Sequence, residues 1–239
     1  MAFKLFGIRK TFDDLAVLDG IDLEIASSGL LVILGPSGCG KTTLLKIVAG
    51  LDRDFEGERE GFETSRFSFV FQDHRLLPWK SAVDNALFAL SGSGLEGKEA
   101  HERINRYVAL AGLSGHENRP IRELSGGMRQ RASLVRAFAM PADMLLLDEA
   151  FQSVDLKRKR ELMGIFLELR AMERNASILV THDPGEALWL ADRIVVLSDR
   201  PARVVDSFEI DLPRDRREAG MPEIAGLERR LNAALLGVG

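Results

Sequence analysis

Several features that would place a chain in a common protein class are scarce or missing here. Cys39 is the only cysteine among the 239 residues, so an intramolecular disulfide is impossible and the chain suits a reducing compartment. No apolar run approaches the roughly 18 residues that a membrane-spanning helix needs. The first residues show no long apolar run before a small-residue cleavage site, so we expect no secretory signal. Any function across a membrane would therefore require separate membrane-spanning subunits.

The sequence also lacks an excess of basic residues. It has 32 Lys and Arg against 36 Asp and Glu, for a net charge of -4. Proteins that bind nucleic acid usually carry a basic excess or a basic patch, so we expect no nucleic-acid partner. The remaining composition, 46% apolar and 28% charged, is ordinary for a globular chain that can bury a core.

Short apolar runs alternate with longer helical patterns along the chain. The runs are strand-sized and rich in Val, Ile, Leu and Phe, which predicts an α/β fold with a largely parallel sheet. The clearest runs are Leu30–Leu34, Phe67–Phe71, Met144–Leu147, Ser177–Val180 and Ile194–Leu197.

Polar residues follow four of these runs directly. In open α/β sheets, ligands bind just beyond the carboxyl ends of the strands, so four polar clusters in that position predict one shared site. The clusters are a glycine-rich loop from Gly35, then Gln72, then Asp148 with Glu149, then Thr181 with His182.

The glycine-rich loop fits the phosphate-binding P-loop pattern G-x-x-x-x-G-K-[ST]. Glycines let backbone N–H groups turn inward around phosphate oxygens, the lysine reaches the β- and γ-phosphates, and the hydroxyl can ligand Mg²⁺. A helix predicted over Thr43–Ala49 would direct its N-terminal end at the anion. The residues expected to contact a nucleotide are Gly35, Pro36, Ser37, Gly38, Cys39, Gly40, Lys41, Thr42 and Thr43.

Two further stretches carry candidate chemistry. Asp148 ends a strand, where a carboxylate can hold Mg²⁺, and Glu149 points elsewhere and could polarise an attacking water, although acidic residues also end strands for structural reasons.

The stretch Leu124–Arg131 reads LSGGMRQR. In it Ser125 is predicted to cap a helix over Met128–Met140 whose start could bind a phosphate, although a merely capped helix explains the same residues.

LSGGMRQR resembles the signature of ABC-type ATPases, and the resemblance covers nearly the whole chain. It implies a P-loop NTPase (RecA-like) fold with a mostly parallel sheet, a small antiparallel β part and an inserted helical subdomain. One ABC ATPase domain over 1–239 would comprise a nucleotide-binding α/β core (1–72 and 141–212), a helical signature subdomain (73–140) and a C-terminal helical tail (213–239).

The resemblance also implies roles for single residues. Gln72 matches the Q-loop glutamine and His182 the switch histidine, so that these two and Glu149 would be catalytic. Phe12 matches the aromatic residue that stacks on adenine, although an isolated phenylalanine is more often a core residue. Mg²⁺ would be held by Thr42, Gln72 and Asp148. In the family the signature completes the ATP site of a second copy, which adds as nucleotide contacts Ser125, Gly126, Gly127, Gln130 and, from the D-loop Gln152–Asp155, Asp155.

The implied function is ATP hydrolysis by a head-to-tail homodimer that drives membrane-spanning permease subunits from the cytoplasmic face of the membrane. Val70–Trp79, Arg200-Pro201 and Asp211–Arg214 are similar to the branch that imports nitrate, aliphatic sulfonates and taurine, whose complete systems include an extracytoplasmic solute-binding protein. An exporter ATPase remains the nearest alternative, ahead of a DNA-repair or ribosome-associated ABC ATPase and of a GTPase or kinase.

Four local expectations remain. The largely apolar Leu76–Trp79 is expected to dock on the membrane subunit, although a buried corner of the helical subdomain would explain it equally. Asp183 should cap a helix with Glu186 reaching back to it. The Cys39 thiol, near a helix N-terminus and a lysine, should be reactive, unless its side chain points into the protein. Gln152 stands where the family usually has a small residue, which could alter coupling between the two ATP sites.

Overall fold

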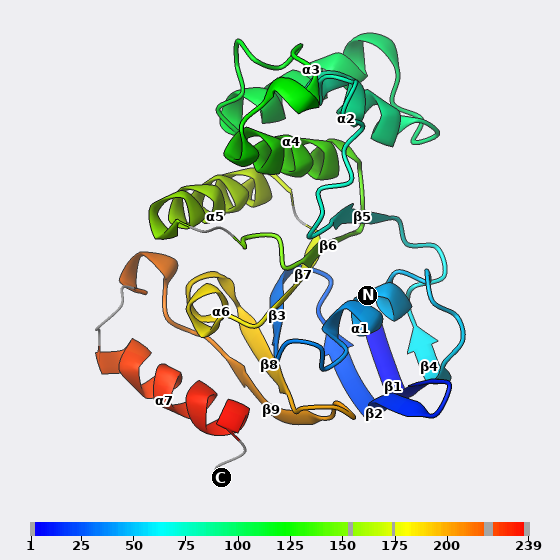
Figure 1. The fold of residues 1–239 in the computed structure, drawn as a ribbon, viewed down its shortest axis with the longest axis vertical. Helices are drawn as coiled ribbons and strands as arrows, with labels where there is room; N and C mark the ends of the chain where they lie inside the picture. Colours follow the sequence, from blue (N-terminus) through cyan, green and yellow to red (C-terminus); the bar gives the residue numbers. More distant parts are fainter. Residues whose placement is uncertain (1–2, 153–154, 174, 218–221, 237–239) are drawn as a thin grey trace. The chain divides into compact units, whose positions relative to one another are not determined.

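The structure is a computed structural model that describes residues 3–152, 155–173, 175–217 and 222–236. The chain divides into two compact units, the first made of Met1–Ser65 with Ala176–Gly239 and the second of Arg66–Asn175. In Figure 1 the first unit carries the blue to cyan and the yellow to red parts of the colour bar, and the second unit carries the cyan to yellow part between them. No helix within the described residues is both long and apolar enough to cross a membrane.

The first unit contains an antiparallel sheet and a mostly parallel one. The antiparallel sheet has the order β2-β1-β4, with β1 at Phe3–Phe12, β2 at Leu15–Ile25 and β4 at Glu56–Glu60. In the other sheet β7, β3 and β8 are parallel neighbours and β9 joins antiparallel at the edge. These strands are β3 (Gly29–Leu34), β7 (Ala176–Thr181), β8 (Arg193–Leu197) and β9 (Val204–Glu209).

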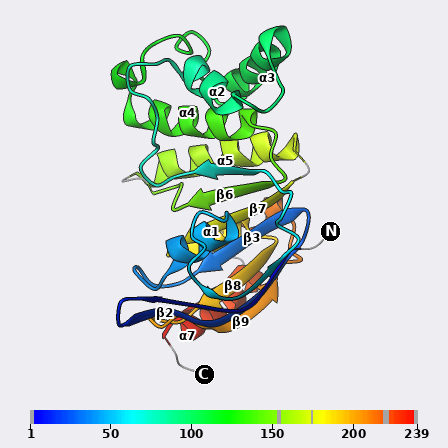
Figure 2. The same ribbon diagram turned by 90° about the vertical axis from the view of Figure 1, so that its right-hand side faces the viewer.

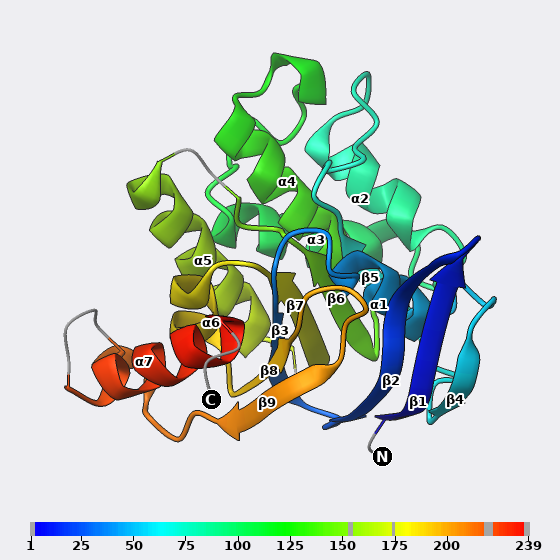
Figure 3. The same cartoon turned by 60° about the horizontal axis from the view of Figure 1, so that its bottom comes forward.

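Helices cover both faces of this parallel sheet. Figure 3 shows α6 (Pro184–Leu190) and α7 (Pro222–Leu236) on one side, and α1 (Lys41–Val48) with the antiparallel sheet on the other. Every residue of β7 is buried, as are Leu30 to Leu34 of β3, which explains why these strands are mostly apolar and carry no charged residue. A short 3₁₀ turn at Arg214–Arg216 precedes α7.

The second unit is mainly helical. Its strands β5 (Phe67–Val70) and β6 (Met144–Asp148) pair in parallel, with Val70 opposite Leu147. In Figure 2, α4 forms a middle layer. The pair α2 and α3 lies on one side of it, and α5 with the two strands lies on the other. The helices are α2 (Ala82–Leu90), α3 (Gly97–Leu110), α4 (Gly126–Ala139) and α5 (Leu156–Ala171), with a 3₁₀ turn at Ile121–Glu123.

The predicted α/β class, the parallel strands and the small antiparallel part are confirmed. The element boundaries differ by a few residues, most clearly for α4, which begins at Gly126 rather than Met128 because its Ser125 cap fixes the first turn. The boundaries between core, helical subdomain and tail stay a prediction. Ser153 and Val154 of the predicted D-loop lie outside the described residues.

Candidate nucleotide-binding site

The P-loop leaves β3 at Gly35 and enters α1 at Lys41. Gly40 has φ +122°, and a Cβ there would lie 2.8 Å from a methyl carbon of Val17 and 2.9 Å from one of Leu18, both on β2. Only glycine satisfies both the backbone angle and this close approach. The loop is thereby fixed in front of the first turn of α1, as the P-loop pattern predicts.

Lys41 is buried within its own loop. Its Nζ donates to the carbonyl oxygens of Gly35 at 2.8 Å and Pro36 at 2.7 Å. The neighbouring Thr42 is exposed at the start of α1. The loop thus combines a buried cation with an adjacent exposed residue that carries a hydroxyl, the two side chains by which a P-loop contacts a triphosphate and its metal.

The prediction of a reactive thiol at Cys39 is wrong. The residue is 1% exposed, and its Sγ lies 3.1 Å from the position that a Cβ on Gly35 would take, so the side chain points into the protein. Burial raises the pKa of the thiol, outweighing the opposite effect of the Lys41 charge. Cys39 therefore contributes its backbone to the loop, and its side chain serves packing.

Arg200 is a neighbour of the P-loop that the sequence analysis did not assign to it. Its Nε donates to the carbonyl oxygen of Gly38 at 3.0 Å, and a second nitrogen of the guanidinium contacts the same atom. In the sequence, the Arg200-Pro201 pair indicates only a family branch and does not predict this contact. The contact joins residues that are 162 positions apart in the sequence, so it depends on the tertiary fold.

Phe12 lies at the end of β1 and is not a core residue. The residue is 46% exposed, and the ammonium of Lys10 lies 4.7 Å from the centroid of its ring. An exposed aromatic face within the unit that holds the P-loop excludes the core alternative. It leaves a flat surface on which a base could stack.

His182 is exposed between β7 and α6. The preceding Thr181 donates its hydroxyl hydrogen to Glu186 at 2.5 Å and accepts from the Asp183 amide at 3.1 Å, while the Asp183 carboxylate accepts from the Gly185 and Glu186 amides. Asp183 therefore caps α6, as predicted. Glu186 is expected to bond the cap residue directly, but its carboxylate accepts from the Thr181 hydroxyl, which in turn accepts from the Asp183 backbone amide.

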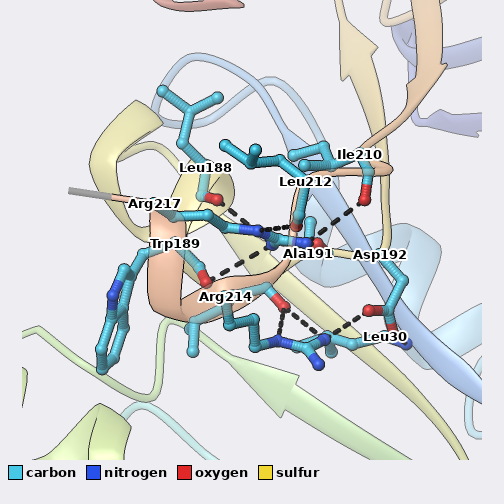
Figure 4. Close-up of polar contacts among 10 residues, drawn as sticks. Leu30, Leu188, Trp189, Ala191, Asp192, Ile210, Leu212, Arg214 and Arg217 are labelled. Carbon is cyan, nitrogen blue, oxygen red and sulfur yellow. Dashed lines mark hydrogen bonds and ion pairs between the residues drawn. The ribbon is translucent and has the colours of Figure 1, made fainter. Parts of the chain in front are cut away.

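Two arginines hold the other end of α6 (Figure 4). Arg217, 6% exposed, donates to the carbonyls of Leu188 at 3.3 Å and Ala191 at 2.5 Å, and also to those of Ile210 and Leu212. Arg214 donates to the carbonyl of Leu190 at 3.0 Å and pairs with Asp192. The carbonyls at a helix end lack partners within the helix, and cations there also oppose the helix dipole favourably. The seven-residue helix that follows His182 is thus fixed at both ends.

Two polar clusters of the first unit do meet. β3 and β7 pair with Leu34 opposite Thr181, and the Gly35 amide donates to the Thr181 carbonyl at 3.3 Å. The start of the P-loop and the segment that carries His182 are therefore adjacent, as the strand pattern predicted for this pair.

The acidic pair belongs to the second unit. Asp148 is the last residue of β6 and only 7% exposed, and Glu149 follows with φ +47°, in the left-handed region that non-glycine residues rarely adopt. The chain therefore leaves its extended strand conformation between the two acidic residues. This fits one carboxylate for a metal and one for another task.

Gln72 and Glu149 are brought together by a third residue, Gln152. The Gln72 side-chain nitrogen donates to the Gln152 side-chain oxygen at 3.3 Å, and the Gln152 side-chain nitrogen donates to the Glu149 carboxylate. The parallel pairing of β5 with β6 places both strand ends side by side. The second pair of predicted clusters therefore also meets, and convergence of all four stays a prediction.

The signature stretch forms the start of α4. Ser125 Oγ accepts from the Met128 amide at 3.3 Å, and the Arg129 guanidinium donates to the Leu124 carbonyl at 2.8 Å. Apart from the chain neighbours and the backbone of α4 itself, no described atom lies within 4 Å of a Cβ built on Gly127, and Gly126 would meet only the Arg129 side chain, at 3.9 Å. Packing among the described residues therefore does not require the two glycines. Asp155 caps α5 by accepting from the Lys157 amide at 2.9 Å.

Comparisons with known proteins agree on one family. Residues 18–152 match the ABC transporter family. The chain is 40% identical over 231 residues to an aliphatic sulfonates import ATP-binding protein, SsuB 2, of Burkholderia cenocepacia, with 93% of this chain and 83% of that protein covered. It is 41% identical over 228 residues to the SsuB 2 protein of Nocardia farcinica, covering 95% of this chain and 92% of that protein.

Solved structures show the same fold. The dimeric structure of MJ0796, described as a bacterial ABC transporter cassette, superposes with a TM-score of 0.75 at 26% identity, covering 88% of this chain and all of that one. A dimeric post-hydrolysis state of MJ0796 bound to ADP and Pi superposes with a TM-score of 0.73 at 25% identity, again covering 88% and 100%. The chain therefore belongs to the ABC transporter family. Within that family it is an ATP-binding subunit that hydrolyses ATP.

Proposed function

We propose that this chain powers the import of an aliphatic sulfonate, or of a similar small solute such as nitrate or taurine, through separate permease subunits. The observation that carries the proposal is the 40 to 42% identity, over at least 90% of this chain, to several sulfonate import ATP-binding proteins. The Val70–Trp79 stretch and the Arg200-Pro201 pair support the same branch.

The first unit would bind the nucleotide. The exposed ring of Phe12 offers a stacking surface for adenine, and the P-loop amides with Lys41 would hold the phosphates. Phosphate oxygens would then replace the loop carbonyls as the main partners of the Lys41 ammonium. Ser37 and Gly38 are exposed at the loop tip and accessible to ligand.

The candidate metal ligands have the chemistry that Mg²⁺ prefers. Thr42 supplies a hydroxyl, Asp148 a carboxylate and Gln72 an amide oxygen, which are all hard oxygen donors. Burial restricts Asp148 to few directions beyond the strand end. When bound, Mg²⁺ would neutralise charge that develops on the phosphates.

In the proposed hydrolysis, a water oxygen attacks the γ-phosphorus and the bond to the bridging oxygen of ADP breaks. Glu149 would orient the water and accept its proton, and His182 would donate a hydrogen bond toward the γ-phosphate. Gln72 would help to hold the water. The chain's contribution is mainly positioning and charge stabilisation, as in other phosphoryl transfers.

The signature would act on the ATP of a second copy in a head-to-tail dimer. Gly126 and Gly127 support this, because none of the described residues of their own chain comes close enough to require a glycine at either position. Together with the capped start of α4, they leave backbone amides accessible to a phosphate from outside. Gln130 and Asp155 would lie at the same interface.

The permease would dock on the second unit. Trp79 and Phe88 are 65% and 64% exposed, an unusual amount of bare aromatic surface near Gln72 in the sequence. We place the chain on the cytoplasmic face of the membrane, peripheral to the permease, with an extracytoplasmic solute-binding protein completing the system.

Deletion of the encoding gene tests the transported class. The deletion strain should fail to grow with an aliphatic sulfonate as the sole sulfur source and should grow normally on sulfate. Wild-type sequence should restore growth, and Glu149→Gln should not. Unimpaired growth of the deletion strain on sulfonate, nitrate and taurine would count against import of this class. Accumulation of a solute inside the cell would also count against it and would favour an exporter.

A further inference from the structure

Gln152 links the side chains that are assigned to hydrolysis in the second unit. Its amide nitrogen donates to Glu149 and its amide oxygen accepts from Gln72 at 3.3 Å. A glycine, alanine or serine at this position could not reach both neighbours. The bridge is therefore a property of this chain's own glutamine.

The chemistry of the bridge gives it a fixed direction. An ionised carboxylate only accepts hydrogen bonds, so the NH₂ group of Gln152 must face Glu149 and its oxygen must face away, toward Gln72. The NH₂ group of Gln72 must then face Gln152. The side-chain oxygen of Gln72 is consequently directed away from the bridge, which is the orientation that a metal or water ligand needs.

The backbone beneath the bridge is held as well. The backbone N–H of Gln152 donates to the backbone carbonyl of Glu149 at 3.3 Å. The backbone carbonyl of Gln152 accepts from the side chain of Gln130, on α4, at 3.0 Å. Glu149 itself has a left-handed backbone conformation that is unfavourable for a non-glycine residue, so its surroundings must hold it.

The loop after Gln72 is anchored independently. Arg136, on α4, donates to the carbonyls of His74 at 2.8 Å and Arg75 at 2.6 Å. The Arg75 guanidinium covers the ring of Phe71 at 4.1 Å from its centroid. Both backbones are held by these contacts, and Gln152 bonds the side chains of Gln72 and Glu149 that extend from them.

We infer that Gln152 is a positioning residue for ATP hydrolysis, whose amide sets the orientation of the Glu149 carboxylate and of the Gln72 amide. The inference rests on the roles proposed above for these two residues. Gln152 acts through them and does not itself touch the reacting atoms.

Steady-state ATPase kinetics of the purified full chain test the inference. Gln152→Ala should lower kcat about tenfold, the order expected for removing a hydrogen bond that orients a charged group, with the KM for ATP and the melting temperature nearly unchanged. Gln152→Glu, nearly the same shape, should be at least as slow because it replaces the donor with a like charge. Lys157→Ala, exposed nearby and outside the bridge, is the matched control.

A double variant separates positioning from simple destabilisation. If Gln152 acts through Gln72, adding Gln152→Ala to the Gln72→Ala variant should lower kcat by a clearly smaller factor than adding Gln152→Ala to the wild type. If kcat of Gln152→Ala is unchanged or raised while Glu149→Gln is inactive, the inference about Gln152 is overturned and the proposed role of Glu149 stands. Normal turnover by Glu149→Gln would overturn the role of Glu149 and this inference with it.

Discussion

The ammonium group of Lys41 lies 2.7 Å from the carbonyl oxygen of Pro36, inside the loop that the two residues share. The position is one from which a lysine can neutralise phosphate charge, so Lys41→Ala should weaken ATP binding by about a hundredfold, the order expected for a lost hydrogen-bonded charge pair. Titration with a fluorescent ATP analogue measures the affinity. Lys46→Ala, an exposed lysine on the same helix, should bind normally. Equal affinities for the two variants would contradict the assignment.

The signature predicts a composite site. Ser125→Arg should leave ATP bound to each monomer and prevent dimer closure, because a long cation would fill the space meant for the γ-phosphate of the other copy. Size-exclusion chromatography with ATP should show a dimer for Glu149→Gln and a monomer for Glu149→Gln with Ser125→Arg. Adding Ser114→Arg instead, at an exposed serine of the same unit, should preserve the dimer. Equal dimerisation of all three proteins would refute the composite site.

Trp79 should contribute to the surface that docks on the permease. Trp79→Ala should reduce co-purification of the membrane subunit while basal ATPase activity stays normal, since the exposed indole has little to lose inside its own chain. Leu156→Ala, at a leucine that is 69% exposed on α5, is the matched control. A large fall in melting temperature for Trp79→Ala would favour the buried-corner explanation instead.

Cys39 should resist thiol reagents in the folded protein. Because burial raises the pKa of its thiol, little of the reactive thiolate forms and little of it is accessible. Maleimide labelling at pH 7 should be slow with or without ATP, and rapid after unfolding in guanidinium. Since no other cysteine is present, each signal belongs to this residue. Fast labelling of the folded chain would show that the side chain is accessible after all.

Local pattern predicted much of this fold. An apolar run, a glycine-rich loop and a helix start lie consecutively in the sequence, so β3, the P-loop and α1 could be placed without tertiary information. The same holds for the caps at Ser125 and Asp183, whose partners are only two or three residues away.

Contacts between distant segments could not be predicted in this way. Gln72 and Gln152 are 80 residues apart and meet only because β5 and β6 pair in register. Arg217 looks like part of a charged, exposed tail, yet it is buried because the end of α6 presents carbonyls that need donors. The direction of the Cys39 side chain depends on the backbone angles of the glycines on either side, which residue types alone do not give.

Phosphate release by the purified chain, compared between the wild type and Glu149→Gln at saturating ATP and Mg²⁺, tests the central claim most directly. The wild type should hydrolyse ATP. Glu149→Gln should bind ATP with near-normal affinity and lose at least about 99% of turnover, since an amide cannot accept the proton of the attacking water. No hydrolysis by the wild type, or equal rates for the two proteins, would contradict the account.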